Sequence, residues 1–487
     1  WLEAFTGSDA GSTEADGVDY TMTVSPQRGT ISSDSEHTQA LRSAPEKGSA
    51  SEPYDLSMYD IDGVARSGMT TANSYVVRAP GTYRIPLVYG NAVKDGATNE
   101  VSYNPGTVAN GLETFVKHDD KPITSACLAD NSGVVPENAV LLWNDANDGF
   151  LTVSPVLSTY TATIDGASRQ LDYIVFTIDK DNIMQGNAMV AVRNSAGEVL
   201  WSWHIWVTRY DPDAELVAYG KIYTWDNDGD GIKDYTFMDR NLGALNNEPM
   251  DVDNRGMFYQ WGRKDPFMPA RSAYHADTDS NNIPAYNETN YEVGNGSGSW
   301  IFNATTLPLT TPPGNIPNAI QNPMTYLQPY YSDHYNWYCA SKDEKVTHSG
   351  LWGPEKTIFD PCPVGYKVPG SNLWGIPSGN TSLRNGGPVE DYDENGVSDK
   401  WDWNKAEDCG RRWKNTGDYY PMVGNVYYLS INKTTHNYTG GQAFYWTCQP
   451  TPVTTSADCY RQDFNDNWAI YQTGAHVYSA QVRCVKE

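Results

Sequence analysis

The run VLWSWHIWVT (residues 199–208) decides the fold class of this chain. From Trp201 to Val207 every second residue is large and apolar, which predicts a β-strand with one buried face. The run AMVAVR (188–193) precedes it, and the turn-forming residues NSAG (194–197) lie between the two. Two apolar runs around a short turn that contains Gly predict a β-hairpin.

Further strand signals extend outward from this hairpin. Four runs are rich in β-branched and aromatic residues: 74–78, 82–89, 139–143 and 173–178. The first two flank an Ala-Pro-Gly turn and are predicted to pair with each other. We therefore expect residues 53–210 to form an antiparallel β-sandwich. His204 falls on the face opposite the alternating apolar residues, where we expect it to pack within the sheet rather than catalyse a reaction.

The chain divides into three parts. Residues 1–52 are polar, with β-like runs at 20–24 and 37–41, and they read as the tail of an immunoglobulin-like β domain followed by a linker. The strand pattern breaks near Asp211, and residues 211–487 are predicted to form a separate, loop-rich α+β domain. The expected fold class is therefore mainly β with a minor α component.

Composition limits the function classes. The chain has 34 Lys and Arg residues against 60 Asp and Glu residues, a net charge of -26. Nucleic acids and anionic membranes attract basic faces, so no nucleic-acid partner is expected. No window approaches the roughly 18 apolar residues of a membrane-spanning helix. We expect an exported protein whose leader lies upstream of Trp1.

Two acidic loops, DNDGDGIKD (226–234) and DYDENGVSD (391–399), share one spacing of oxygen-bearing side chains. Each has Asp or Asn at positions 1, 3, 5 and 9 and Gly at position 6, as calcium-binding loops do. The predicted Ca²⁺ ligands are Asp226, Asp228, Asp230 and Asp234 in the first loop, and Asp391, Asp393, Asn395, Asp399 and Asp402 in the second. The ion would be structural.

The alternative for both loops is a polar turn that binds no metal, since such turns are common in exported β proteins. The second loop has an acid, Asp402, at position 12, whereas the first has Phe237. Trp401 and Trp403 flank that acid, which makes them candidates to stack on a ligand such as a sugar ring. Two further tryptophans in polar surroundings, Trp374 and Trp337, are candidates for the same role.

Seven cysteines are present, and none forms a CxxC pair, which argues against a zinc or thioredoxin-like site. Six of them follow residue 330, which favours disulfides in one exported domain, with Cys127 as a buried thiol. The alternative is that all are reduced in an intracellular protein. The sequence has no Ser-His-Asp order, no Gly-rich phosphate loop and no HExxH motif, so an enzyme is not expected.

Several strings resemble a known family. SYVVRAPGTYRIPLVYGN (74–91), GNAMVAVRN (186–194) and WSWHIWVT (201–208) resemble the β-sandwich of fimbrillin-type cell-surface proteins of gut Gram-negative anaerobes. A second group resembles the lectin-like "major paralogous" domain that such proteins carry at the C-terminus: TFMDRNLG (236–243), GMFYQWGRKDPF (256–267), IFDPCPVGYKVP (358–369) and VRCVK (482–486). Residues 1–52 resemble the last strands of a BACON-type immunoglobulin-like domain.

The lectin-like resemblance implies disulfide pairings. In the C-type lectin fold the segment that opens the first helix is bonded to the last strand, which corresponds here to Cys362 and Cys484. A bridge that closes so long a loop contributes on the order of 4 to 5 kcal/mol in the chain-entropy model. Cys448 and Cys459 would clasp a local hairpin, and Cys339 with Cys409 is the remaining pair.

The resemblance also implies a function. We expect a non-enzymatic cell-surface or fimbrial adhesin, in the outer membrane or a pilus, whose lectin-like domain binds glycans or surface proteins of host or microbes. Its other partners would be pilus subunits. Two alternatives stay open: a structural pilus subunit or cap with no ligand of its own, and an accessory protein of surface glycan degradation.

Overall fold

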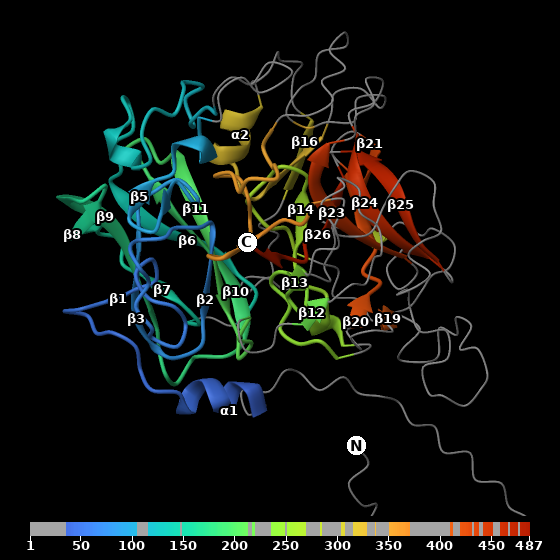
Figure 1. The fold of residues 1–487 in the computed structure, drawn as a ribbon, viewed down its shortest axis with the longest axis horizontal. Helices are drawn as coiled ribbons and strands as arrows, with labels where there is room; N and C mark the ends of the chain where they lie inside the picture. Colours follow the sequence, from blue (N-terminus) through green and yellow to red (C-terminus); the bar gives the residue numbers. More distant parts are fainter. Residues whose placement is uncertain are drawn as a thin grey trace, which may run out of the picture.

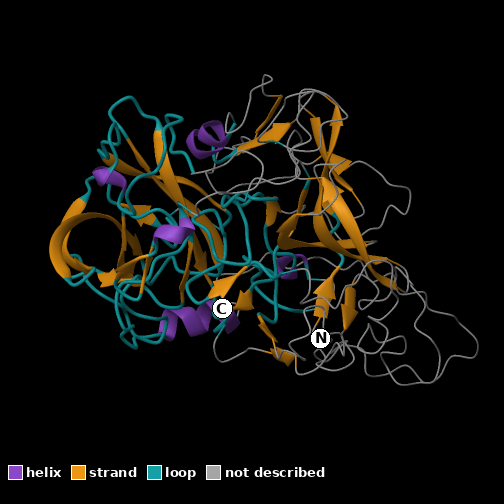
Figure 2. Ribbon diagram, turned by 45° about the horizontal axis from the view of Figure 1, so that its top comes forward, coloured by secondary structure: helices purple, strands orange, loops and turns teal. Residues whose placement is uncertain are grey.

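A computed structural model of the chain confirms the mainly β fold class with a minor helical component (Figures 1 and 2). The structure describes residues 36–104, 115–146, 149–212, 217–219, 235–248, 251–268, 283–284, 303–306, 315–328, 337, 350–370, 410–412, 419–430, 433–437, 442–450, 458–465, 468–475 and 478–487. No helix among these residues is long and apolar enough to cross a membrane.

Two sheets form a sandwich-like body on the left of Figure 1. The first sheet has the order β1-β3-β9-β7, with β8 also paired to β9: β1 (Tyr54–Asp55), β3 (Gly81–Pro86), β7 (Thr152–Val153), β8 (Ser158–Ile164) and β9 (Ala167–Ile178). The second has the order β2-β11-β10-β6: β2 (Ser74–Val77), β6 (Asn138–Asn144), β10 (Gly186–Arg193) and β11 (Val199–Val207).

The predicted hairpin around residues 194–197 is confirmed. β10 and β11 are antiparallel, and Met189 lies opposite His204 in their register. All nine residues of β11 are buried, including the polar Ser202 and His204. A strand with only one buried face would expose every second residue, so both faces of β11 are covered.

The predicted pairing of 74–78 with 82–89 is wrong. β2 pairs in parallel with β11, whereas β3 lies in the other sheet, antiparallel to β9 and parallel to β1. The chain between them crosses from one sheet to the other through Arg78, Ala79 and Pro80 instead of reversing in one sheet. Gly81 permits the crossing, because its φ of +151° lies outside the range of other residues and a Cβ there would lie 1.9 Å from the carbonyl oxygen of Lys47. The sheets are thus mixed rather than purely antiparallel.

The predicted strand at 37–41 is also wrong, because these residues belong to helix α1 (Glu36–Ser43). Thr38 and Leu41 are its buried residues, and their spacing of three places them on one helical face. A run of five residues is too short for periodicity to separate strand from helix. The other β-like run, 20–24, lies outside the described residues.

Two further sheets are built from residues after 211. One has the order β12-β13-β27-β18: β12 (Val217–Tyr219), β13 (Tyr235–Phe237), β18 (Tyr366–Lys367) and β27 (Val485–Lys486). The larger has the order β15-β22-β21-β26-β23-β24-β25, with β14 on β26: β14 (Phe258–Gln260), β15 (Ile283–Pro284), β21 (Asn425–Ser430), β22 (Lys433–Asn437), β23 (Gln442–Pro450), β24 (Asp458–Asn465), β25 (Trp468–Ala475) and β26 (Ser479–Gln481). β21 and β23 to β25 form the right side of Figure 1.

Short elements complete the description. They are α2 (Ile316–Gln321), the 3-10 helices η1 (Glu100–Ser102), η2 (Leu128–Asp130) and η3 (Val252–Asn254), and the strand pairs β4 (Val93–Lys94) with β5 (Ala97–Thr98), β16 (Asn303–Thr306) with β17 (Thr325–Gln328), and β19 (Gly410–Arg412) with β20 (Tyr419–Pro421). The aromatic run AFYWT (443–447) lies within β23, and the run AQVRCV (480–485) is divided between β26 and β27.

The disulfide between Cys362 and Cys484 is present, as the lectin-like resemblance implies. The pairing of Cys448 with Cys459 is wrong, because the Cys448 thiol is free and buried. β23 and β24 do form the expected hairpin, but their register places Cys459 opposite Pro450. Cys448 itself lies in an irregularity of that register, between Trp446 and Pro450, and has no partner directly opposite it. Cys339 and Cys409 lie outside the described residues.

Thiol labelling tests this cysteine assignment. Cys127 is a buried free thiol, as predicted, and burial raises its pKa to about 11 and that of Cys448 to about 12. Thiolates are the reactive species, so both should resist iodoacetamide at neutral pH in the folded protein. Both should react in guanidinium without reductant, whereas Cys362 and Cys484 should not. Mass spectrometry of the digest gives the answer, and a peptide linking Cys448 to Cys459 would contradict the register argument.

Candidate functional site

The residues predicted to bind calcium lie outside the described residues, as do three of the ligand-binding tryptophans. The outlying residues are Asp226, Asp228, Asp230, Asp234, Asp391, Asp393, Asn395, Asp399, Asp402, Trp374, Trp401 and Trp403. Within the described part of the chain, no group of three or more His, Cys, Asp or Glu side chains is placed to hold a metal. The calcium prediction stays a prediction.

Trp337 is the one ligand-binding candidate whose position is described, and it is a core residue. Its side chain is 1 % exposed, and its indole N–H donates to the carbonyl oxygen of Trp261 at 2.8 Å. Its own carbonyl accepts a hydrogen bond from Asn315. An indole without an exposed face cannot stack on a sugar, so the prediction that Trp337 binds a ligand is wrong.

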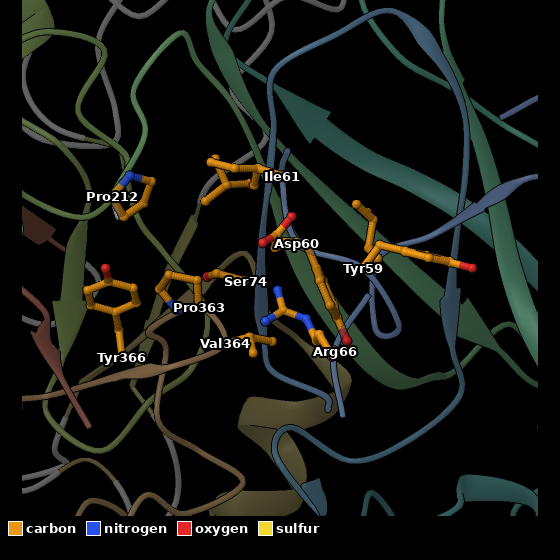
Figure 3. Close-up of a pocket in the computed structure, with 12 residues that line it drawn as sticks. Tyr59, Asp60, Ile61, Arg66, Ser74, Pro212, Pro363, Val364 and Tyr366 are labelled. Atoms are coloured by element: carbon orange, nitrogen blue, oxygen red, sulfur yellow. The ribbon is translucent and has the colours of Figure 1, made fainter. Parts of the chain in front are cut away.

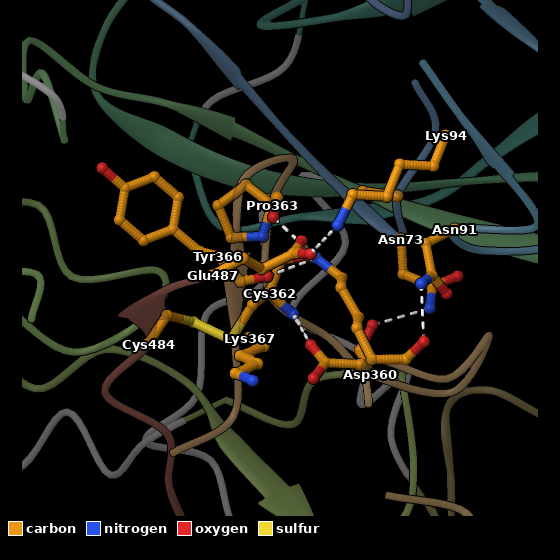
Figure 4. A network of polar contacts seen from close by, with 12 residues as sticks. Asn73, Asn91, Lys94, Asp360, Cys362, Pro363, Tyr366, Lys367, Cys484 and Glu487 are labelled. Atoms are coloured by element: carbon orange, nitrogen blue, oxygen red, sulfur yellow. Dashed lines mark hydrogen bonds and ion pairs between the residues drawn. A yellow bond between two sulfur atoms is a disulfide. The ribbon is translucent and has the colours of Figure 1, made fainter. Parts of the chain in front are cut away.

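The best-defined site is the junction between the sandwich and the residues after 211. The segment 356–363 lies against the sandwich, and Asn73 and Asn91 donate side-chain hydrogen bonds to its backbone (Figure 4). Ser74 donates a further one. The acceptors are the carbonyl oxygens of Ile358 (2.6 Å) and Asp360 (2.8 Å) for Asn73, Pro361 (2.6 Å) for Ser74 and Lys356 (2.6 Å) for Asn91. Buried residues of both parts, 53–210 and 211–487, belong to one hydrophobic cluster. The domain boundary between the two parts stays a prediction.

Phe359 is the apolar contact of this segment with the sandwich. Its ring lies 5.5 Å from the ring of Trp201 and 5.2 Å, edge to face, from that of Phe115. The indole N–H of Trp201 donates to Asn73, which itself holds the segment through its amide. Aromatic pairs of this kind contribute about 0.5–1.5 kcal/mol each beyond their buried area, so the junction combines apolar and directional contacts.

Lys356, at the start of the segment, bonds to the backbone at its end. Its buried ammonium donates to the carbonyl oxygens of Cys362 (2.9 Å), Pro363 (2.7 Å) and Tyr366 (Figure 4). Burial lowers the pKa of Lys356 below its usual value. An ammonium has three donors and here all three are used, so the group orders the backbone around the Cys362–Cys484 disulfide.

Asp360 orders the same stretch of backbone through its carboxylate. Its carboxylate accepts the backbone N–H groups of Cys362 (2.8 Å) and Val368 (2.9 Å). Burial raises the pKa of Asp360 to about 6, and the positive charge of Lys356 draws it partly back. A carboxyl group with a raised pKa is a common sign of a general acid. Asp360 is however 1 % exposed and bonded to backbone, so we assign it a structural role.

A second polar cluster joins β11 to residues 264–265. The Ser202 hydroxyl donates to the Asp265 carboxylate at 2.7 Å, and the Lys264 ammonium donates to the same carboxylate at 2.6 Å. Lys264 also lies 4.5 Å from the ring centroid of Trp201. The face of β11 turned to this cluster carries polar residues because it meets charged partners from the later part of the chain.

His204 lies on the same strand and contacts two residues, Ser74 and Asn187, that each bond across the junction. Its Nδ1 is 3.1 Å from Ser74 Oγ, and its Nε2 is 2.9 Å from Asn187 Oδ1. Asn187 donates in turn to the carbonyl oxygen of Gly243 at 3.0 Å. His204 is 1 % exposed, which confirms the expectation of a packed sheet residue.

The burial of His204 predicts a stability that falls in acid. Burial lowers its pKa from 6.5 to about 3, so the unfolded chain takes up a proton well before the folded protein does. The stability linked to neutral His204 is therefore present above about pH 6.5 and is lost as the pH falls, by about 2–3 kcal/mol down to about pH 4.5. The raised pKa of Asp360 acts in the opposite direction, with stability lost as the pH rises towards about 6.

Urea denaturation of wild type and His204→Gln across this pH range isolates the histidine contribution. The variant should be less stable at neutral pH, since its amide cannot reproduce both ring contacts, but its stability should fall less steeply towards acid. Equal slopes in the two proteins would contradict the assignment of a neutral, buried imidazole.

A cleft opens to solvent beside the junction (Figure 3). About 490 Å³ of free space, including space open to solvent, lies between β2, the loop around Tyr59 to Arg66, and a wall formed by Pro212, Pro363 and Tyr366. Asp60 lies in it, but its carboxylate already accepts the backbone N–H groups of two residues of its own loop. The lining has aromatic, apolar and charged side chains and neither His nor Cys. A mixed apolar and charged lining of this kind is typical of ligand-binding clefts.

The sequence analysis did not identify these junction residues, although their polar character within apolar runs is visible in the sequence. Ser202, His204 and Asn187 are polar residues within or beside apolar strand runs, and Lys356 and Asp360 lie on either side of the apolar pair Ile358 and Phe359. Polar residues at such positions indicate a strand face that meets polar partners. The partners themselves come from segments up to 287 residues away, which a local pattern cannot identify.

Comparison of the chain with protein-family models, with curated proteins and with solved structures returned no match.

Proposed function

We propose that this protein is an exported, non-enzymatic cell-surface or fimbrial adhesin that binds glycans or surface proteins through residues 211–487. The observation that carries the proposal is the disulfide between Cys362 and Cys484. It joins the segment 358–369 to the end of the chain, which is the pairing that the resemblance to lectin-like domains implies. Disulfides of this kind persist in oxidising compartments, which supports export.

The chemistry of the described residues supports binding over catalysis. The buried charged groups Lys356, Asp360 and Lys264 are bonded to backbone carbonyls, backbone amides or each other rather than pointed into a cleft. A catalytic acid or base has to reach a substrate atom within hydrogen-bond distance. These groups hold the two parts of the chain together and leave the surface clefts to recognition.

Glycan-array binding of the full chain tests the proposal. The full chain is the right material, because removal of residues before 211 would expose Phe359 and the carbonyls that Asn73 and Asn91 satisfy. We expect binding in millimolar calcium, weakened by chelator and by Trp401→Ala with Trp403→Ala. Absence of binding to glycans and surface proteins, with co-purification of the chain with pilus subunits, would instead support a structural pilus role.

A further inference from the structure

A second cleft lies where the β10–β11 hairpin meets the turn that follows α2. It encloses about 780 Å³, including space open to solvent. Arg193 and Glu198 line it from the hairpin, Leu142 from β6, and residues 321–325 from the later part of the chain. Both predicted domains therefore contribute side chains to it, and it is distinct from the cleft beside Pro363.

Arg193 is the unusual member of this lining. Its side chain is half-buried, its Nε is buried without a hydrogen-bond acceptor, and its guanidinium makes no hydrogen bond or ion pair with the residues that the structure describes. The acid in the same lining, Glu198, forms no ion pair with it among the described contacts and accepts a hydrogen bond from Asn194 at 2.7 Å. An unpaired guanidinium in a cleft of a chain with a net charge of -26 points to an anionic ligand.

The opposite wall is fixed from inside the protein. Arg263 is fully buried, and its guanidinium donates to the carbonyl oxygens of Thr325 (2.7 Å) and Asn322 (3.3 Å). Burial lowers the pKa of Arg263 to about 10, so it stays charged at neutral pH. These bonds draw the carbonyl oxygens of the turn inward. The wall is therefore preformed and needs little ordering when a ligand binds.

The rest of the lining has the apolar and polar groups that a sugar ring can contact. Leu142, Pro323 and Met324 supply apolar contact. Gln321 and Asn322 use their amide nitrogens within the protein, on His118 and Asn318 respectively, and their side-chain oxygens accept no hydrogen bond from described residues. Such acceptors match the hydroxyl donors of a saccharide ring.

We propose that this cleft binds the carboxylate of an acidic saccharide, with Arg193 donating to the carboxylate and Gln321 and Asn322 accepting from ring hydroxyls. The proposal rests on the proposed glycan-binding function and assigns it a ligand class. A planar carboxylate can accept two parallel hydrogen bonds from one guanidinium, a geometry that a lysine cannot reproduce.

Titration of the full chain by calorimetry or ligand-observed NMR tests the cleft directly, with glucuronic acid and N-acetylneuraminic acid as probes and glucose as the neutral control. We expect binding of at least one acid and none of glucose. Arg193→Gln should weaken the binding at least tenfold, and Arg193→Lys should recover only part of it. Lys180→Gln, at an exposed turn, makes the same charge change and should leave binding unaltered. The melting temperature of Arg193→Gln should match that of wild type, since the guanidinium of Arg193 makes no hydrogen bond with the described residues that the substitution would remove.

The outcomes separate the two proposals. Equal binding by wild type and Arg193→Gln, binding of neither acid, or response to an acidic peptide alone overturns the cleft assignment. If glycan-array binding survives in Arg193→Gln unchanged, the cleft assignment fails while the adhesin proposal stands. If the array shows no ligand for wild type, the adhesin proposal fails, and the titration with free acids still decides the cleft.

Discussion

Replacing Lys356 by Met is expected to lower the free energy of unfolding by about 3–5 kcal/mol. The substitution keeps most of the side-chain volume but removes the ammonium that donates to Cys362, Pro363 and Tyr366. Three buried carbonyls then lose a donor at once. The carboxylate of Asp360 also loses the positive charge that offsets its burial.

Lys367→Met is the matched control, because it removes the same ammonium group at a position 11 residues further along the chain. Lys367 donates one exposed hydrogen bond, to the carbonyl oxygen of Pro354 at 2.8 Å. Its loss should cost under about 1 kcal/mol. Guanidinium denaturation followed by tryptophan fluorescence compares the two. Similar stabilities for both variants would show that Lys356 does not order the turn.

A double variant separates charge from packing. Asp360→Asn on its own disturbs the acceptors for the N–H groups of Cys362 and Val368. In the Lys356→Met background it also removes an uncompensated buried carboxylate, so the two changes should cost less together than their sum, by about 0.5–3 kcal/mol. Strict additivity would mean that the two groups act independently.

Local patterns in the sequence predicted the strands well where the strand and its partner are neighbours in the chain. The hairpin of β10 and β11 followed from alternating apolar residues around a four-residue turn, and both strands and their pairing are confirmed. The pairing of β2 failed because alternation identifies a buried face and not the neighbour along the strand edge. β2 reaches β11 across more than a hundred residues, with Ser74 opposite His204.

The strand pattern also did not predict that both faces of β11 are buried. The alternation from Trp201 to Val207 predicts one buried face, but Ser202 and His204 on the polar face are buried as well. They are covered by Asp265 and, through Asn187, by Gly243. Polar contacts between distant segments leave no periodic signal, which is why the junction could not be derived from the strand pattern.

The cysteines show the same division between what a resemblance and what a local pattern can supply. The bridge from Cys362 to Cys484 spans 122 residues and was predicted only because a resemblance implied it. Cys448 and Cys459 are close in sequence and do lie on paired strands, yet their register keeps them from direct opposition. Register depends on where a hairpin turns, and the sequence between the two strands did not define that position.

Substituting Gly90 by Ala is the second change with a large expected effect, because the backbone of the sandwich and that of segment 356–363 touch at this residue. Gly90 has a φ of +38°, and a Cβ there would lie 2.3 Å from the carbonyl oxygen of Ile358. That oxygen is held in place by Asn73 at 2.6 Å, and the residue after Gly90, Asn91, holds Lys356. The backbone cannot move aside without breaking these bonds.

Gly166→Ala supplies the matched control for backbone conformation. Gly166 has a φ of +74° in the turn between β8 and β9, and a Cβ there would meet nothing within 4 Å. This control measures the conformational cost of a positive φ alone, about 1 kcal/mol. Gly90→Ala should cost about 3 kcal/mol or more, since it adds a steric conflict between two backbones.

Hydrogen exchange locates the effect. In Gly90→Ala the amides of Cys362 and Val368, which Asp360 accepts, should exchange faster than in wild type, whereas the amides of the β10–β11 hairpin away from the junction should change little. If the segment detaches before the sandwich unfolds, denaturation should also become biphasic. A Gly90→Ala protein as stable as Gly166→Ala, with unchanged protection of Cys362 and Val368, would show that the two parts of the chain do not meet at Gly90.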